Sequence, residues 1–73
     1  MSMPRKVTTA VEQVRQTIRE AERRGQTRYA IAKAAEMPRS QLTRIATGQT
    51  TPNLATAERI LDVIGYRLII VAK

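Results

Sequence analysis

The chain has 73 residues, with 13 Lys and Arg against 6 Asp and Glu, a formal net charge of +7, and neither Cys nor His. This composition lacks the residues of ordinary structural zinc sites, disulfides and imidazole acid–base catalysis, and its scattered carboxylates form no catalytic pattern. At this length folding removes only about 60 % of the unfolded chain's surface from water, so oligomerisation is the support that remains for the core. We therefore expect one domain, no enzyme, no metal and no cofactor.

The basic excess consists mainly of arginine, which suits phosphates and guanine edges better than lysine does. Such an excess on a small domain favours a nucleic-acid partner. Attraction to anionic lipid is the alternative, but no basic amphipathic helix with aromatic anchors supports it. No signal-peptide pattern opens the chain, and its longest apolar run, Leu68 to Ala72, is far shorter than the roughly 20 residues that span a bilayer. A cytoplasmic protein without a membrane partner is expected.

A flexible basic arm, residues 1–7, precedes the first predicted helix. The capping box Thr9-Ala10-Val11-Glu12 opens this helix, apolar residues recur in it every three or four positions, and it ends before Gly25. Beside the apolar stripe, arginines at i, i+4 and i+8 can pair with glutamates of the same helix on a solvated face. The arginines are Arg15, Arg19 and Arg23, and the glutamates are Glu12, Glu20 and Glu22.

Two short helices follow, separated by about three residues. The first runs from Arg28 to about Ala35, and its alanines imply close packing against another helix. Glu36-Met37-Pro38 interrupts the pattern, because proline disfavours helical backbone at the residue before it and suits the first turn of the next helix. The second helix begins at Pro38 or Arg39 and ends at Thr47. This spacing is typical of a helix-turn-helix unit.

A fourth helix and a strand complete the predicted elements. Asn53 caps the helix, which ends at Gly65. Its apolar stripe consists of Leu54, Ala57, Ile60, Leu61 and Ile64. The next segment, Tyr66 to Val71, is β-prone, and its four consecutive apolar residues require cover on both faces. Since no other strand is predicted, its simplest partner is the same strand of a second copy, paired antiparallel about a two-fold axis. The alternative is an irregular tail lying over the helices.

The segment from Thr27 to Gly65 resembles the Cro and lambda-repressor type of helix-turn-helix family, also called the XRE family. The matching motifs are Thr27-Arg28-x-x-Ile31-Ala32, Pro38 to Ile45, Gly48, Pro52-Asn53-Leu54 and Ala57 to Gly65. The resemblance implies an all-α, compact four-helix DNA-binding domain over residues 8–65, with the helix-turn-helix at about 27–47. The following tail, residues 66–73, resembles that of HigA/HipB-type antitoxins and small prophage regulators, in which a short β-strand pairs across the dimer.

Two residues depart from the family pattern. Glu36 stands where the family usually has a glycine in the turn, and glutamate does not easily adopt a positive φ. A differently shaped or mildly strained turn is therefore expected, which puts the angle between the two helices in question. Ala46 stands where many relatives carry an acidic residue, a change that leaves the fold intact.

By this resemblance the third helix is the recognition helix, which lies in the major groove of DNA. Leu42, Ile45 and Ala46 share its inner side. The polar residues expected to contact base edges are Arg39, Ser40, Gln41, Thr43 and Arg44. Arginine can form two hydrogen bonds with guanine and glutamine two with adenine, although a phosphate contact is the alternative for each of the two arginines.

Phosphate contacts are expected at helix ends and in the loop after the recognition helix, where amides, hydroxyls and a positive dipole end are available. The residues are Thr27, Arg28, Thr47, Gln49, Thr50 and Asn53. Ordinary helix capping is the alternative role for the threonines and the asparagine. The expected dimer interface consists of the tail side chains Tyr66, Leu68, Ile69, Ile70 and Val71.

Charge, motif and tail together predict a homodimeric transcriptional regulator that binds double-stranded DNA at an inverted-repeat operator, with repression as the favoured role. Such a protein is nucleoid-associated when bound. The alternative is an antitoxin that binds a toxin protein and autoregulates its operon. Recognition of single-stranded RNA is disfavoured, because only two aromatic residues, Tyr29 and Tyr66, could stack on bases.

Overall fold

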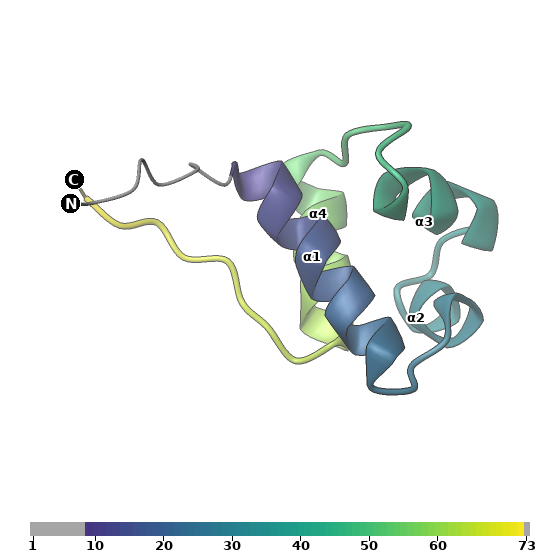
Figure 1. Ribbon diagram of the computed structural model, residues 1–73. Coiled ribbons are helices and arrows are strands. Elements are labelled where there is room, and N and C mark those ends of the chain that lie inside the picture. The colour runs from purple at the N-terminus through teal and green to yellow at the C-terminus, as the bar shows by residue number, and fades with distance from the viewer. Residues whose placement is uncertain (1–8, 73) are drawn as a thin grey trace, which may run out of the picture.

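The computed structural model describes residues 9–72, and these residues form four helices and no strand (Figure 1). In chain order the helices are α1 (Ala10–Arg23), α2 (Arg28–Ala34), α3 (Arg39–Ala46) and α4 (Leu54–Val63). The predicted all-α class is confirmed, and each helix lies close to its predicted bounds. None of these four helices combines the length and the apolarity needed to cross a membrane. The predicted basic arm lies outside the described residues.

Polar side chains cap the first turns of three helices. The hydroxyls of Thr9 and Thr27 and the side-chain oxygen of Asn53 each accept a hydrogen bond from the amide three residues further on, at 2.8–3.1 Å. Each bond satisfies an amide that has no partner within the helix. α3 differs, because its N-cap residue is Pro38 and no side chain caps it.

The four described helices all end at a residue with positive φ. After α1, α3 and α4 this residue is glycine, but after α2 it is Glu36, with φ +58°. The Glu36 amide donates to the Lys33 carbonyl (3.2 Å) and the Met37 amide to the Ala32 carbonyl (3.0 Å), the pair of bonds that defines a Schellman ending. The turn thus has the hydrogen bonding that a glycine would give it, while Glu36 carries a backbone cost of about 1 kcal/mol. The strain expected here is found.

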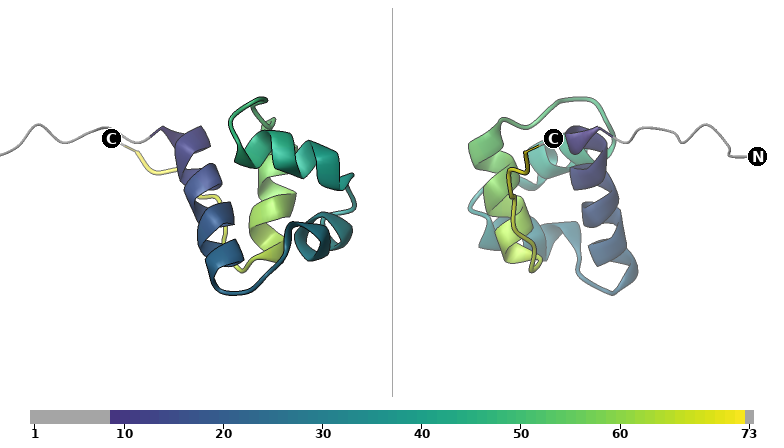
Figure 2. Two further views of the ribbon diagram at one scale, coloured as in Figure 1. Left: turned by 45° about the vertical axis from the view of Figure 1, so that its right-hand side comes forward. Right: turned by 90° about the vertical axis from the view of Figure 1, so that its left-hand side faces the viewer.

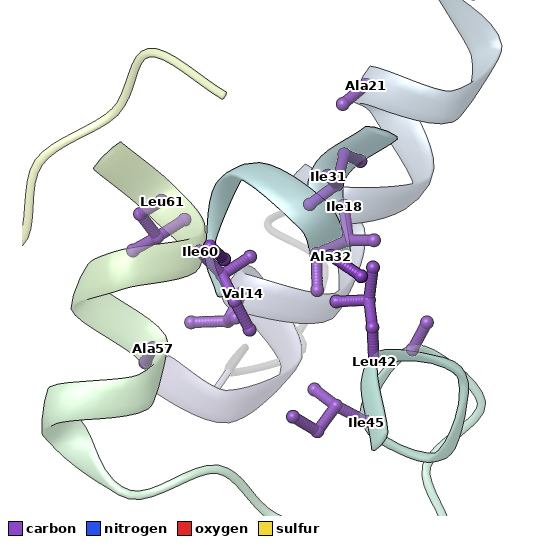
Figure 3. Close-up of a cluster of buried hydrophobic side chains, with 12 residues drawn as sticks. Val14, Ile18, Ala21, Ile31, Ala32, Leu42, Ile45, Ala57, Ile60 and Leu61 are labelled. Carbon is purple, nitrogen blue, oxygen red and sulfur yellow. The ribbon is translucent and has the colours of Figure 1, made fainter. Parts of the chain in front are cut away.

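The core lies between the inner faces of the four helices (Figure 3). Its largest fully buried side chains are Ile18, Ile31, Leu42, Ile45 and Ile60. Burying each of them contributes about 1.5–3 kcal/mol to the free energy of folding. Ala32 of α2 and Ala35, which follows its last residue, are also buried, in agreement with the close packing expected of this alanine-rich helix.

Leu54 is a correction to the predicted apolar stripe of α4. Its side chain is 79 % exposed, whereas Ala57, Ile60 and Leu61 of the same stripe are buried. Leu54 is the first residue of the helix, and no described element covers this turn. The buried part of the stripe therefore begins one turn later than the periodicity suggests.

Residues 66–72 form an extended tail that turns back from the end of α4 and runs outside the helices (Figures 1 and 2). The Tyr66 amide donates to the Leu61 carbonyl (2.8 Å), and no backbone hydrogen bond follows within the described chain. Leu68 packs against the core, but Ile69, Ile70 and Val71 are 72 %, 101 % and 73 % exposed. The predicted strand does not form within a single chain, because no second strand is present to pair with it.

Candidate nucleic-acid interface

α3 presents an apolar side to the core and a polar side to solvent. Leu42, Ile45 and Ala46 are at most 1 % exposed, as the periodicity predicts. The other side chains of the helix, exposed or half-buried, are Arg39, Ser40, Gln41, Thr43 and Arg44. Figure 2 shows α3 at the edge of the molecule, next to α2. All five side chains expected to contact bases therefore belong to a single outer helix and lie off its core side.

The outer side of α3 is positively charged. Neither α3 nor the loop that follows it contains an acidic residue. Arg39 and Arg44 take part in none of the ion pairs found within residues 9–72. The uncapped first turn of α3 adds amides without helical partners and the positive end of the helix dipole. This side of the molecule suits a polyanion.

The loop after α3 holds four of the expected phosphate contacts, and all four residues are exposed. The Thr47 hydroxyl donates to the Thr43 carbonyl (2.8 Å), and the Asn53 oxygen caps α4, so both have local structural roles. The amides of Gln49 and Thr50 donate to the Arg44 carbonyl (2.8 and 3.2 Å), which folds the loop back on the end of α3. The loop thus lies directly beside the end of α3.

Arg28 differs from the expectation of a guanidinium available for phosphate. Its Nε pairs with Glu22 of α1, and both side chains are partly buried. Glu22 was expected to pair with arginines of its own helix. The sharp turn between α1 and α2 instead brings Arg28 alongside the last turn of α1, and the ion pair neutralises its charge.

Arg15 and Arg19 also depart from the predicted glutamate pairing. The Arg15 Nε donates to the Ile45 carbonyl (3.0 Å) and its Nη2 to the Thr50 carbonyl (3.3 Å), while the Arg19 Nη2 donates to the Ala46 carbonyl (3.4 Å). These two side chains reach across to the end of α3, because its last carbonyls lack helical partners.

Arg23, the last of the three arginines, does pair with a glutamate on the solvated face of α1. Arg23 lies 3.1 Å from Glu20, as expected, and Arg24 lies 3.9 Å from the same carboxylate. These side chains are exposed, so the pairs contribute little to stability. Of the three arginines expected on this face, only Arg23 forms an ion pair with a glutamate of α1.

One contact on the surface of α2 was not predicted from the sequence. The Lys33 Nζ lies 5.9 Å from the centre of the exposed Tyr29 ring, a cation–π arrangement. Their i, i+4 spacing on a helix is the signal that could have identified the pair. The lysine adds a further cation on α2, the helix that precedes α3.

The arrangement agrees with comparisons to known proteins. A family described as "Helix-turn-helix domain" matches residues 11–66. No curated protein and no solved structure was found to match the chain. The matched segment includes most of α1, all of α2, α3 and α4, and the first residue of the tail. Since it covers well over half of the sequence, the chain belongs to the helix-turn-helix domain family.

Proposed function

We propose that the protein is a sequence-specific regulator of the XRE type that binds double-stranded DNA as a homodimer, with repression as the favoured role. The observation that carries the proposal is the polar outer side of α3, with two arginines outside the described ion pairs and no acidic residue on the helix. The major groove of B-DNA admits such a helix, while the preceding helix crosses the backbone.

Base recognition is assigned to the outer side chains of α3. Arg39 and Ser40, in the first turn, reach the base edges first, since this end of a recognition helix enters the groove. Arg39 or Arg44 can form two hydrogen bonds with guanine, and Gln41 can do so with adenine. Thr43 contacts a base edge or a thymine methyl group from the middle of the helix.

Phosphate contacts are assigned to the helix ends and to the loop after α3. The proposed residues are Thr27, Arg28, Thr47, Gln49, Thr50 and Asn53. Capping does not compete with this role at Asn53, because the cap uses its oxygen and leaves the amide NH₂ group for phosphate. Arg28 is the weakest member of the set, since Glu22 already neutralises it.

Dimerisation is assigned to the tail, through Tyr66, Leu68, Ile69, Ile70 and Val71. Its unpaired backbone and exposed aliphatic side chains support antiparallel pairing with a second copy. A cavity of about 820 Å³ lies between the tail and α4. Two acidic and two basic side chains line it, namely Glu58, Asp62, Arg59 and Arg67.

Selection of bound sequences from random double-stranded DNA tests the proposal. A two-fold dimer places its recognition helices about 34 Å apart, so the selected site is expected to be an inverted repeat with half-sites one helical turn apart. Affinity is expected to fall steeply with salt, because phosphate neutralisation releases counterions. An asymmetric site with one contact patch would contradict the dimer, and no enrichment at all would contradict sequence-specific binding.

Two substitutions separate base recognition from phosphate contact. Arg39→Ala is expected to reduce discrimination at one base pair by about 1–3 kcal/mol, whereas Gln49→Ala, at a proposed phosphate contact in the loop, is expected to weaken binding to all sequences alike. Affinities for the selected operator and for single-base variants measure the difference. Uniform weakening by both substitutions would show that Arg39 does not recognise a base.

An antitoxin remains the second candidate, because the exposed aliphatic tail could bind a toxin protein in place of a second copy. In that case the protein would bind the toxin and also its own operon. Purification of the tagged protein from its native host distinguishes the two roles. A stoichiometric small protein that is released when Ile70 is replaced by Asp would favour the antitoxin, whereas self-association alone would favour the regulator.

A further inference from the structure

We propose that Arg15 of α1 is a positioning residue for DNA recognition: its forked guanidinium holds the end of α3 and the following loop in one fixed arrangement. Arg15 does this by joining the Ile45 carbonyl to the Thr50 carbonyl. The inference rests on the proposed DNA-binding function, because it concerns how the residues assigned to that function are held.

The two hydrogen bonds connect parts of the chain that are far apart in sequence. The Arg15 Nε lies 3.0 Å from the oxygen of Ile45, 30 positions away, and its Nη2 lies 3.3 Å from the oxygen of Thr50, 35 positions away. Ile45 belongs to the last turn of α3, whereas Thr50 belongs to the loop. A single side chain of α1 therefore ties both segments to the helical body.

The end of α3 provides a chemical reason for these contacts. The last carbonyls of a helix lack helical partners and carry the negative end of its dipole. Within the described chain, Ile45 accepts from the Gly48 amide (3.2 Å) and from Arg15. Ala46 accepts from Arg19 (3.4 Å). Two arginine side chains thus donate directly to backbone carbonyls that lack helical partners, and these contacts stabilise the end of α3.

The fork distinguishes Arg15 from its neighbour Arg19. Arg15 uses two different nitrogens on two carbonyls, an arrangement that a planar guanidinium holds in fixed geometry. Arg19 makes one described contact, with Ala46, and its side chain is more exposed. A lysine can replace a single contact, but its one nitrogen on a flexible stem cannot reproduce the fork.

The location of the fork connects it to recognition. The segment that it spans, from Ile45 to Thr50, contains three of the proposed phosphate contacts, Thr47, Gln49 and Thr50. Phosphate contacts fix the register in which a recognition helix meets base edges. Arg15 therefore acts through these residues, by fixing where they lie relative to α3, and does not itself contact DNA.

Arg15→Lys tests the fork, and Arg19→Lys is the matched control that also keeps its charge. We expect Arg15→Lys to weaken binding to a selected operator by about tenfold, whereas Arg19→Lys should change it by less than about twofold. Far-UV circular dichroism verifies that both variants fold. Equal affinity of wild type and Arg15→Lys would overturn the proposal, as would equal losses in both variants.

The salt dependence of binding separates positioning from direct phosphate contact. Arg15→Gln removes the charge, but the slope of log affinity against log salt should match that of the wild type if Arg15 does not touch DNA. In the proposed dimer, a direct phosphate contact by Arg15 in each subunit would instead reduce the slope by about 1.8, which is about 0.9 for each lost contact. That reduction would overturn the proposal.

Amide hydrogen exchange provides a measurement that needs no DNA. The amides of Gln49 and Thr50 hold the loop to Arg44, and they should exchange several-fold faster in Arg15→Lys but not in Arg19→Lys. The Ile18 amide in the core is the internal control and should not change. If no form of the protein binds DNA, the proposed function fails. This measurement still tests whether Arg15 holds the loop in place. Unchanged loop exchange in Arg15→Lys would overturn the positioning role.

Discussion

The helical body, residues 9–65, buries most of its large apolar side chains, whereas the tail, residues 66–72, exposes most of its own. In the body, Ile18 and Ile60 are completely buried, and helix ends are closed by caps and Schellman bonds. In the tail, Ile70 is fully exposed and no backbone hydrogen bond follows Tyr66. The body therefore pairs its polar groups and buries its apolar side chains internally, whereas the tail exposes both to solvent.

This difference places the stability of the monomer in the body and supports the proposed association through the tail. A soluble domain gains little from exposed aliphatic side chains, and an extended segment with unpaired backbone groups is a template for pairing. The body has its own core, which is small because the chain is short. The tail contributes only Leu68 to that core. Changes in the body should therefore affect folding, and changes in the tail should affect association.

The largest effect should come from opening the core. Ile18→Ala is expected to lower the free energy of unfolding by about 2–5 kcal/mol, because it leaves a cavity between the helices. The matched tail variant, Ile70→Ala, should leave the unfolding midpoint of the dilute monomer unchanged, since its side chain has no neighbours there. Urea titrations at low protein concentration make the comparison. Similar losses in both variants would show that the tail belongs to the folded body.

Removal of the tail should abolish association at a smaller cost to folding. A variant that ends at Gly65 should be monomeric by light scattering and still helical by circular dichroism. Its loss of unfolding free energy is expected to be about 1 kcal/mol, from the half-buried Leu68. Persistence of a dimer in the truncated variant would refute the proposed strand pairing. Loss of the dimer both on truncation and in Ile70→Asp would place the interface in the tail.

Sequence patterns predicted the helices well because each has local signals. Thr9, Thr27 and Asn53 supply caps, and glycines or a proline mark the ends. The periodicity of α3 also placed Leu42 and Ile45 in the core. Sequence patterns succeed here because the hydrogen bonds that begin and end these helices join residues only a few positions apart.

The failures of prediction all involve contacts between segments. Arg15 was expected to pair with glutamates of its own helix, but its partners lie on other elements, and the Arg28 side chain, expected to be available for phosphate, pairs with Glu22 of another helix. Leu54 fits the period of its helix, yet nothing lies opposite it. Periodicity gives the face of a helix on which a residue lies and not what covers that face. The assignments that need DNA or a second chain remain proposals for the same reason.

The smallest effect concerns the turn between α2 and α3, where the body is strained. Glu36→Gly should raise the free energy of unfolding by about 0.5–1 kcal/mol, because relief of the left-handed backbone exceeds the entropy that glycine adds to the unfolded chain. Glu36 is exposed and forms no described ion pair, so little else is lost. Thermal and urea unfolding measure the gain.

Gly48→Ala is the converse variant at the end of α3. At φ +88° an alanine is strained, although its Cβ would lie 3.9 Å from the Arg15 guanidinium, an ordinary contact. It should therefore lose about 1 kcal/mol through the backbone alone. If Glu36→Gly stabilises and Gly48→Ala destabilises by similar amounts, then a left-handed residue costs about the same after α2 as after α3. A loss in Glu36→Gly would instead mean that the glutamate side chain stabilises the turn by an amount that outweighs its strain.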